Sequence, residues 1–208
     1  MVLRAVCTQQ THFAQLDLPR SSRKCSCMKH LLLAAALCLL TGCSANYRDQ
    51  SVEVMTEPTL DLERYAGLWY EVARFPNFFE RDCVAATAEY TPRPDGRITV
   101  LNSCRDGTLD GELKQAEGVA RIAGDNPARL EVSFTPYIPF AWADYWVLDI
   151  DQDYTVAVIG SPGGGLGWVL ARDRALPPAR VDAALQVLAR NGYDISQVER
   201  FGPDGAPL

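Results

Sequence analysis

The stretch from Leu62 onward constrains the fold most, because it consists of short apolar runs separated by turn-forming residues. Proline, glycine, asparagine and aspartate fill the breaks, and alternation is clearest where Leu130, Val132 and Phe134 share one face. The runs have the lengths of strands and fall near 67–75, 84–91, 97–104, 114–122, 128–135, 144–150, 154–160 and 167–172. Eight strands at this spacing predict an all-β domain, an antiparallel sandwich or barrel.

One helical pattern follows the eighth run. Pro177-Pro178 opens it, and Gly192 stops it. Between them the apolar residues recur at helical spacing, at Val181, Ala184, Leu185 and Leu188. We expect this apolar stripe to pack on the outside of the barrel. Residues 195–201 are a candidate last edge strand.

The N-terminal region has the pattern of an export signal. Residues 28–42 combine a basic start, a ten-residue apolar run and Leu-Thr-Gly, and together with Cys43 they resemble the lipobox of bacterial lipoproteins. The resemblance implies that Cys43 is acylated, and Ser44 directs such a lipoprotein to the outer membrane. We therefore expect a lipid-anchored protein that faces the periplasm. The alternative is an uncleaved hydrophobic helix or a chance occurrence of the Leu-Thr-Gly-Cys sequence. Residues 1–27 are interpreted as an extension before the true start at Met28, and 43–60 as a lipidated tether.

Charge and histidine content exclude several function classes. Residues 43–208 hold 15 basic and 25 acidic side chains, a net charge of −10 that argues against a nucleic-acid partner. Both histidines, His12 and His30, precede Cys43. A mature chain without imidazole excludes Ser-His and Cys-His catalysis and His-ligated zinc. We expect no catalytic residue, no metal and no cofactor.

The two cysteines after Cys43 fit a pair across adjacent strands. A hairpin turn near residues 93–94 would place positions that sum to about 187 opposite each other, which is the sum for Cys83 and Cys104. An exported protein sits in an oxidising compartment, so we expect a disulfide. Two free buried thiols are the alternative.

Three motifs resemble the signatures of the lipocalin family. Gly67-Leu68-Trp69 matches the family's Gly-x-Trp, Gln152-Asp153-Tyr154 matches its Thr-Asp-Tyr with the threonine replaced, and Arg172 matches the arginine of the last strand. The resemblance covers roughly residues 58–201 and is closest to bacterial lipoproteins related to apolipoprotein D. It implies an eight-stranded up-and-down barrel over 61–203, with 204–208 as a tail. It also implies that Trp69 plugs the closed end and that Arg172 lies across its ring.

The resemblance implies a lipid ligand, a fatty acid or lysophospholipid, held inside the barrel. The predicted ligand-binding residues are aromatic or small: Phe75, Phe78, Phe79, Ala86, Ala88, Phe134, Tyr137, Phe140, Trp142, Tyr145 and Trp168. Three interpretations of the aromatic loops stay open, namely the mouth of a lipid site, a homodimer contact and an inward-folding lid. Arg74, Arg81 and Arg105 are candidate headgroup partners, and Glu71 shares the strand parity of Trp69.

Two other functions compete with lipid binding. Some lipocalins are enzymes that act on lipophilic substrates, although this sequence has no recognisable nucleophile motif. A structural envelope lipoprotein with a packed barrel is the third possibility. Whether the inward side chains fill the barrel distinguishes it from a lipid carrier.

Overall fold

The computed structural model describes residues 46–208. The predicted extension at 1–27, the predicted signal peptide at 28–42 and the predicted acylation site at Cys43 lie outside the described residues. Within the described range, no helix has the length and apolarity needed to cross a membrane.

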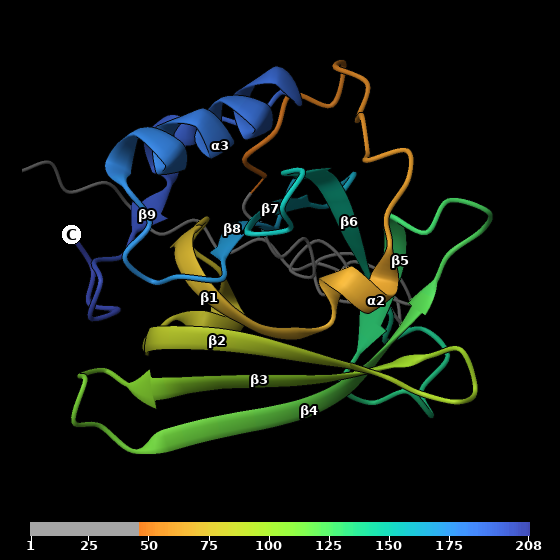
Figure 1. The fold of residues 1–208 in the computed structure, drawn as a ribbon, viewed down its shortest axis with the longest axis horizontal. Coiled ribbons are helices and arrows are strands. Elements are labelled where there is room, and N and C mark those ends of the chain that lie inside the picture. Colours follow the sequence, from red (N-terminus) through yellow and green to blue (C-terminus); the bar gives the residue numbers. More distant parts are fainter. Residues whose placement is uncertain (1–45) are drawn as a thin grey trace, which may run out of the picture. The chain divides into compact units, whose positions relative to one another are not determined.

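Eight antiparallel strands form a closed up-and-down barrel, as predicted (Figure 1). Consecutive strands pair with each other, and the first strand closes the barrel by pairing with both the second and the eighth. The strands are β1 (Gly67–Arg74), β2 (Cys83–Pro92), β3 (Ile98–Asp106), β4 (Leu113–Ile122), β5 (Arg129–Ser133), β6 (Ala143–Ile150), β7 (Val156–Gly160) and β8 (Gly167–Ala171). The loops at 75–82, 107–112, 134–142 and 161–166 therefore gather at one end, which we call the open end.

The opposite end is closed by the predicted tryptophan–arginine pair. Trp69 is fully buried, and the Arg172 guanidinium lies 3.8 Å from its ring centroid. Arg172 also donates to backbone carbonyl oxygens around the short helix α2 (Leu62–Tyr65), at 2.7 Å to Ala66 and 3.0 Å to Tyr65. Gly67 has φ +93°, and a Cβ there would lie 3.4 Å from Arg172 Nη1. Since 3.4 Å is an ordinary contact distance, it is the left-handed φ rather than a lack of space that favours glycine at this position.

The turn that carries the second signature motif is held by residues within and next to the motif. Asp153 is exposed, whereas Asp151 accepts hydrogen bonds from the Thr155 and Val156 amides and from Arg180. Burial raises the pKa of Asp151, but these hydrogen bonds outweigh it and lower the pKa overall. Tyr154 has φ +56°, and its hydroxyl accepts from the Asp61 amide at 2.9 Å. The turn is therefore held by Asp151 and Tyr154.

A β-bulge in β1 changes which side chains face inward. The pairing with β8 shifts register between Glu71 and Ala73, so Glu71 and Arg74 both become buried and contact each other. Phe75 then lies on the outer face, stacked on Tyr47 at 4.7 Å between ring centroids. The prediction that Phe75 binds the ligand is therefore corrected, because strict alternation does not hold across a bulge.

The disulfide between Cys83 and Cys104 is confirmed, but the predicted register is wrong. Cys83 lies opposite Asp106 rather than Cys104, and a bulge with Ala85 at φ +52° follows it in β2. The hairpin turn is also centred at Asp95, because Pro92 pairs with Ile98. The two cysteines are thus diagonal neighbours, with a Cα–Cα distance of 5.4 Å.

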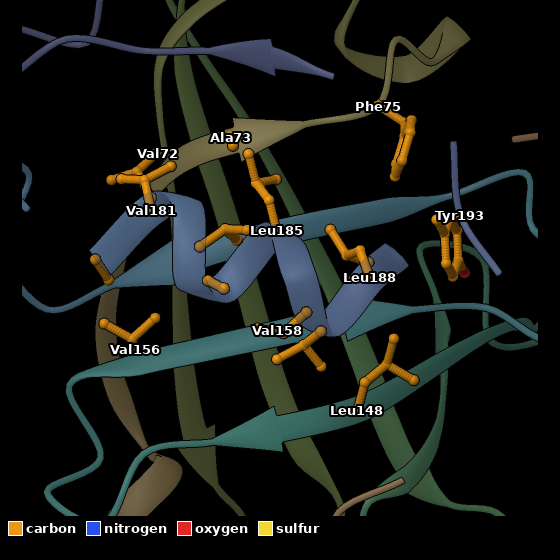
Figure 2. Packing of buried hydrophobic residues seen from close by; sticks show 14 of the residues in the cluster. Val72, Ala73, Phe75, Leu148, Val156, Val158, Val181, Leu185, Leu188 and Tyr193 are labelled. Carbon is orange, nitrogen blue, oxygen red and sulfur yellow. The ribbon is translucent and has the colours of Figure 1, made fainter. Parts of the chain in front are cut away.

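The predicted C-terminal helix, α3 (Pro178–Arg190), packs on the outside of the barrel (Figure 2). It begins after Pro177 and is followed by Gly192 at φ +87°. Val181, Leu185 and Leu188 pack against outward residues of β1, β6 and β7, so all five residues of β7 are buried. This covering explains why the β7 sequence is apolar on both faces.

The segment at 46–60 differs from the predicted tether. Tyr47 is buried, and Arg48 pairs with Tyr193 after α3. Further along, the Glu57 amide donates to Val147 of β6, and Leu60 joins the core of the closed end. This N-terminal segment (46–60) therefore runs along the barrel from the open end to the closed end.

The last residues fold back on the barrel. The region predicted as one edge strand at 195–201 forms a short 3-10 helix, η3 (Ile195–Gln197), and a two-residue strand, β9 (Glu199–Arg200), that pairs with the end of β1. The predicted tail at 204–208 makes a turn in which the Gly205 carbonyl accepts from the Ala85 amide at 2.8 Å. The tail thus contacts the bulge of β2.

Candidate functional site

The lower half of the barrel interior is filled by its own side chains. Trp69, Leu130, Val147, Ile159 and Leu170 pack together next to the closed end. These side chains are almost completely shielded from solvent. This half is a packed core and offers no space for a ligand.

Three tyrosines packed with this core form a hydrogen-bonded layer, in which Tyr65 contacts Trp69 and Tyr145 contacts Trp168. The Tyr145 hydroxyl lies 2.7 Å from the hydroxyls of both Tyr65 and Tyr90. Burial raises the pKa of Tyr65 and Tyr145 well above the usual range and that of Tyr90 to about 12, so all three stay protonated at neutral pH. Because the hydroxyls satisfy one another, this tyrosine layer is a stable floor for whatever lies above it.

The upper half of the interior, which we call the upper lumen, has a wall of small residues on one side. Register places Ala88, Asn102 and Ala116 side by side on the inner face of β2, β3 and β4. Ala116 is nevertheless exposed to solvent, and the ring of Phe134 covers the neighbouring Gly118. An inward residue that is exposed indicates an interior open to water, in contrast to the lower half.

The opposite wall carries buried charge. Arg74 donates to Glu71 at 3.1 Å and to Glu199 at 3.0 Å. Glu80 accepts from the indole nitrogen of Trp168 at 2.9 Å. Burial raises the pKa of Glu71 well above its usual range, and the neighbouring Glu80 raises it further although Arg74 opposes the rise. Arg74 is therefore committed to carboxylates and is not a free rim cation.

Sequence reasoning missed most of this wall. Glu71 was identified only through its parity with Trp69, and Arg74 was expected at the rim. The β1 bulge that turns Arg74 inward has no signature in the sequence. Glu80 follows two exposed phenylalanines, and only the 3-10 helix η2 (Phe78–Glu80) makes it point away from them toward Trp168.

Four aromatic side chains surround the open end with most of their surface exposed. Phe78 and Phe79 in η2 are 76% and 82% exposed, and Tyr137 and Phe140 in the β5–β6 loop are 81% and 90% exposed. We call these four residues the aromatic rim. A surface hollow of about 450 Å³ is lined by Asn46, Ala143 and residues of the β7–β8 loop.

The predicted ligand-binding residues thus separate into three groups. Ala86, Ala88, Phe134, Tyr145 and Trp168 belong to the inner side of the upper half, and Phe78, Phe79, Tyr137 and Phe140 belong to the rim. Phe75 and Trp142 lie outside. Trp142 stacks under Arg121 at 4.0 Å, and Arg121 pairs with Glu131 on the outer face, so the prediction for Trp142 is also corrected.

The titratable groups of the site are carboxyls and phenols. Cys83 and Cys104 are bonded to each other, and both histidines precede the described residues. No group of three or more His, Cys, Asp or Glu side chains in the range 46–208 is placed to hold a metal ion. The site thus combines aromatic and small side chains with carboxyl groups on one wall and Asn102 on the other.

Comparison with known proteins gives consistent relatives. The family model described as a lipocalin-like domain matches residues 60–203. Temperature-induced lipocalin-1 of Arabidopsis thaliana is 34% identical over 157 residues, which cover 71% of this chain and 82% of that protein. Outer membrane lipoprotein Blc of Escherichia coli K12 is 34% identical over 165 residues, 79% and 90% of the two chains. Apolipoprotein D of Macaca fascicularis is 32% identical over 188 residues, 85% and 96%.

Solved structures agree on the architecture. Insecticyanin from the tobacco hornworm Manduca sexta superposes with a TM-score of 0.55 at 21% identity, covering 71% of this chain and 83% of its own. The cockroach allergen Per a 4 has the same TM-score at 19% identity, covering 74% and 96%. At this level of identity the likeness concerns the fold alone.

Proposed function

The chain belongs to the lipocalin family, and on that basis we propose that it binds one small apolar ligand, a fatty acid or a lysophospholipid, in the upper lumen. The observation that carries this proposal is the division of the interior. The half below the tyrosine layer is packed, whereas Ala116 and Phe134 face inward above it and remain accessible to solvent.

The polar groups favour one orientation of the ligand. A ligand carboxylate placed deep in the upper lumen would lie beside the carboxyl groups of Glu71 and Glu80, where burial disfavours the charged form of a carboxyl group. We therefore place the acyl chain toward the tyrosine layer and the headgroup at the open end. Each buried methylene would contribute about 0.8 kcal/mol.

We further propose that Cys43 is acylated and anchors the barrel to the outer membrane, facing the periplasm. The lipobox supports this, and the relative from Escherichia coli is itself named an outer membrane lipoprotein. Two or more acyl chains hold a protein stably on a bilayer. Storage, transport or salvage of membrane lipids is the role consistent with that position.

The two competing functions have less support. An enzyme would have to work without histidine or a free thiol in the residues after Cys43. Glu71, whose pKa is raised chiefly by burial, is already hydrogen-bonded to Arg74. A structural lipoprotein with a packed barrel fits the lower half of the interior only. Uptake of a lipid decides between this last function and lipid binding.

The test uses a matched pair of tryptophan substitutions on β4. Ala116→Trp adds an indole to the inner face, whereas Glu117→Trp adds one to the outer face next to it. We expect Ala116→Trp to weaken binding of a fluorescent fatty acid at least about tenfold, because an indole occupies the volume of several methylenes. Glu117→Trp should leave binding within about twofold of the unchanged protein.

Thermal unfolding of both variants provides the control for folding. Equal binding by the two variants, or no uptake by the unchanged protein, would contradict a ligand site in the upper lumen. Lipid extraction from protein purified out of membranes gives an independent readout, and recovery of no bound lipid would count against the proposal.

A further inference from the structure

The N-terminal segment is fixed to the open end of the barrel at its very start. The Tyr47 amide donates to Gly164 in the β7–β8 loop at 2.9 Å, and the Tyr47 hydroxyl donates to Pro76 in the β1–β2 loop at 2.6 Å. Arg48 donates to Pro162 at 3.0 Å. Two open-end loops therefore hold the chain at the same place, and one of them carries Phe78 and Phe79.

The short stretch of chain between Cys43 and Tyr47 limits how far the proposed lipid anchor can lie from the open end. Cys43 precedes Tyr47 by four residues, and four residues span at most about 14 Å when fully extended. The polar layer on each side of a bilayer's hydrocarbon core is itself about 5–8 Å thick. An acyl group on Cys43 would thus keep the open end close to the membrane surface.

The aromatic rim supplies the surface that such a position requires. Each of its four side chains is more than three-quarters exposed to solvent, namely Phe78, Phe79, Tyr137 and Phe140. Soluble monomeric proteins rarely expose large apolar side chains side by side unless the surface binds something. The loops at 134–142 and 161–166 carry no charged residue. The acidic β3–β4 loop, with Asp110 and Glu112, lies across the barrel from the β7–β8 loop.

We infer that the barrel docks mouth-down on the bilayer that carries its own lipid anchor, with the aromatic rim inserted among the headgroups. The inference rests on the proposed acylation of Cys43 and deepens the proposed function, because a ligand could then pass between bilayer and lumen without crossing water. The occupant of the rim is a lipid surface. The four open-end loops hold four acidic residues and one basic residue, so contact should depend on apolar burial and favour zwitterionic lipid.

Hydrogen exchange measured by mass spectrometry tests this orientation. The full lipidated chain is reconstituted in vesicles of phosphatidylcholine and compared with a Cys43→Ser chain in buffer. Amides in 75–82 and 134–142 should exchange at least about tenfold more slowly in the vesicles. Amides in the closed-end turns at 93–97 and 124–127 should exchange at equal rates. Protection of the closed-end turns, or of neither end, would overturn the inference.

A double variant separates docking from mere anchoring. Phe79→Ser with Phe140→Ser should lose the loop protection while intact mass still shows an acylated Cys43. Met55→Ser with Ile122→Ser is the matched control, because both residues are exposed apolar side chains away from the rim, and it should keep the protection. Protection that appears without vesicles and grows with protein concentration would assign the rim to a second copy of the chain and overturn the inference.

Two further readouts separate this inference from the proposed function. Vesicles containing phosphatidylglycerol should give weaker loop protection than phosphatidylcholine alone, and the opposite order would contradict an apolar contact. Fatty-acid uptake is measured on the Cys43→Ser chain in parallel. Intact uptake without loop protection would overturn docking alone, whereas lost uptake with loop protection would overturn the ligand site alone.

Discussion

Arg172 connects the two parts of the closed end, the plug and the loop that precedes it. Its guanidinium covers the Trp69 ring, and its Nη1 donates to the Leu68 carbonyl at 2.6 Å. Its Nη2 donates to the Arg64, Tyr65 and Ala66 carbonyls. A planar group with five donors can do this, whereas an ammonium group cannot. This residue and Trp69 could be predicted from the sequence, because their family motif states the pairing directly.

Arg172→Lys should therefore destabilise the barrel although it keeps the charge. We expect the free energy of unfolding to fall by about 2 kcal/mol, because several carbonyl oxygens lose their donors and the stacked contact is lost. Urea denaturation measures the change. Arg97→Lys, in the exposed turn between β2 and β3, is the control and should have little effect. Equal stability of both variants would contradict this role of Arg172.

Glu71 gives the barrel a pH dependence of the opposite sign from a surface carboxylate. Its pKa is raised in the folded state above the ordinary value of 4.5, chiefly by burial, so the folded state holds its proton more tightly than the unfolded state. Its contribution to stability is thus complete below that value and is lost as the pH rises through the raised pKa. At higher pH the buried carboxylate is charged, and the loss of its hydration lowers the free energy of unfolding.

Glu71→Gln should remove this dependence. In the unchanged protein, the free energy of unfolding should fall as the pH rises above 4.5 and through the raised pKa of Glu71, by up to about 1.4 kcal/mol per pH unit where Glu71 titrates. The variant should be at least as stable at pH 8 and show a smaller slope. Glu117→Gln, on the exposed face of β4, should keep the original slope. A slope unchanged in Glu71→Gln would contradict the assignment.

At the scale of elements, the sequence predicts where strands and the helix lie and fails where a strand is irregular. All eight strands and α3 are found close to their predicted positions, because hydrophobic periodicity and turn residues are local signals. Phe75 faces outward and Cys83 lies opposite Asp106 because each of β1 and β2 contains a bulge. A single extra residue reverses every later side chain, and no residue type marks it.

The N-terminal segment was also beyond prediction, since its contacts are with residues far along the chain. The ring of Phe75 stacks both on Tyr47 and on Tyr193, which follows α3. A segment with few apolar residues and no periodicity resembles a linker in the sequence alone. Only the outward turn of Phe75, produced by the β1 bulge, creates the surface on which Tyr47 packs.

Tyr47 variants test whether this segment is part of the folded domain. Tyr47→Ala should lower the free energy of unfolding by about 3 kcal/mol, as for other buried aromatic residues. Tyr47→Phe keeps the stacked ring and loses only the hydrogen bond to Pro76, so it should cost about 1 kcal/mol. Unchanged stability in both variants would mean that the segment is a tether, as its sequence first indicates.

At the scale of the whole molecule, the tyrosine layer would limit the length of acyl chain that the proposed lipid site can enclose. The three hydroxyl groups hydrogen-bond to one another, and Tyr65 and Tyr90 belong to the buried core around Trp69. An acyl chain that reaches the layer would be fully sheltered from water, and any further carbon atoms would have to remain in the mouth of the barrel.

We expect the affinity for saturated fatty acids to rise with length by up to about fourfold per methylene and then to level off. Competition against a fluorescent fatty acid measures the series, and affinity that keeps rising with length would contradict a fixed floor. Three hydroxyl groups that hydrogen-bond to one another would thus set the length of the lipid chain that this protein accepts.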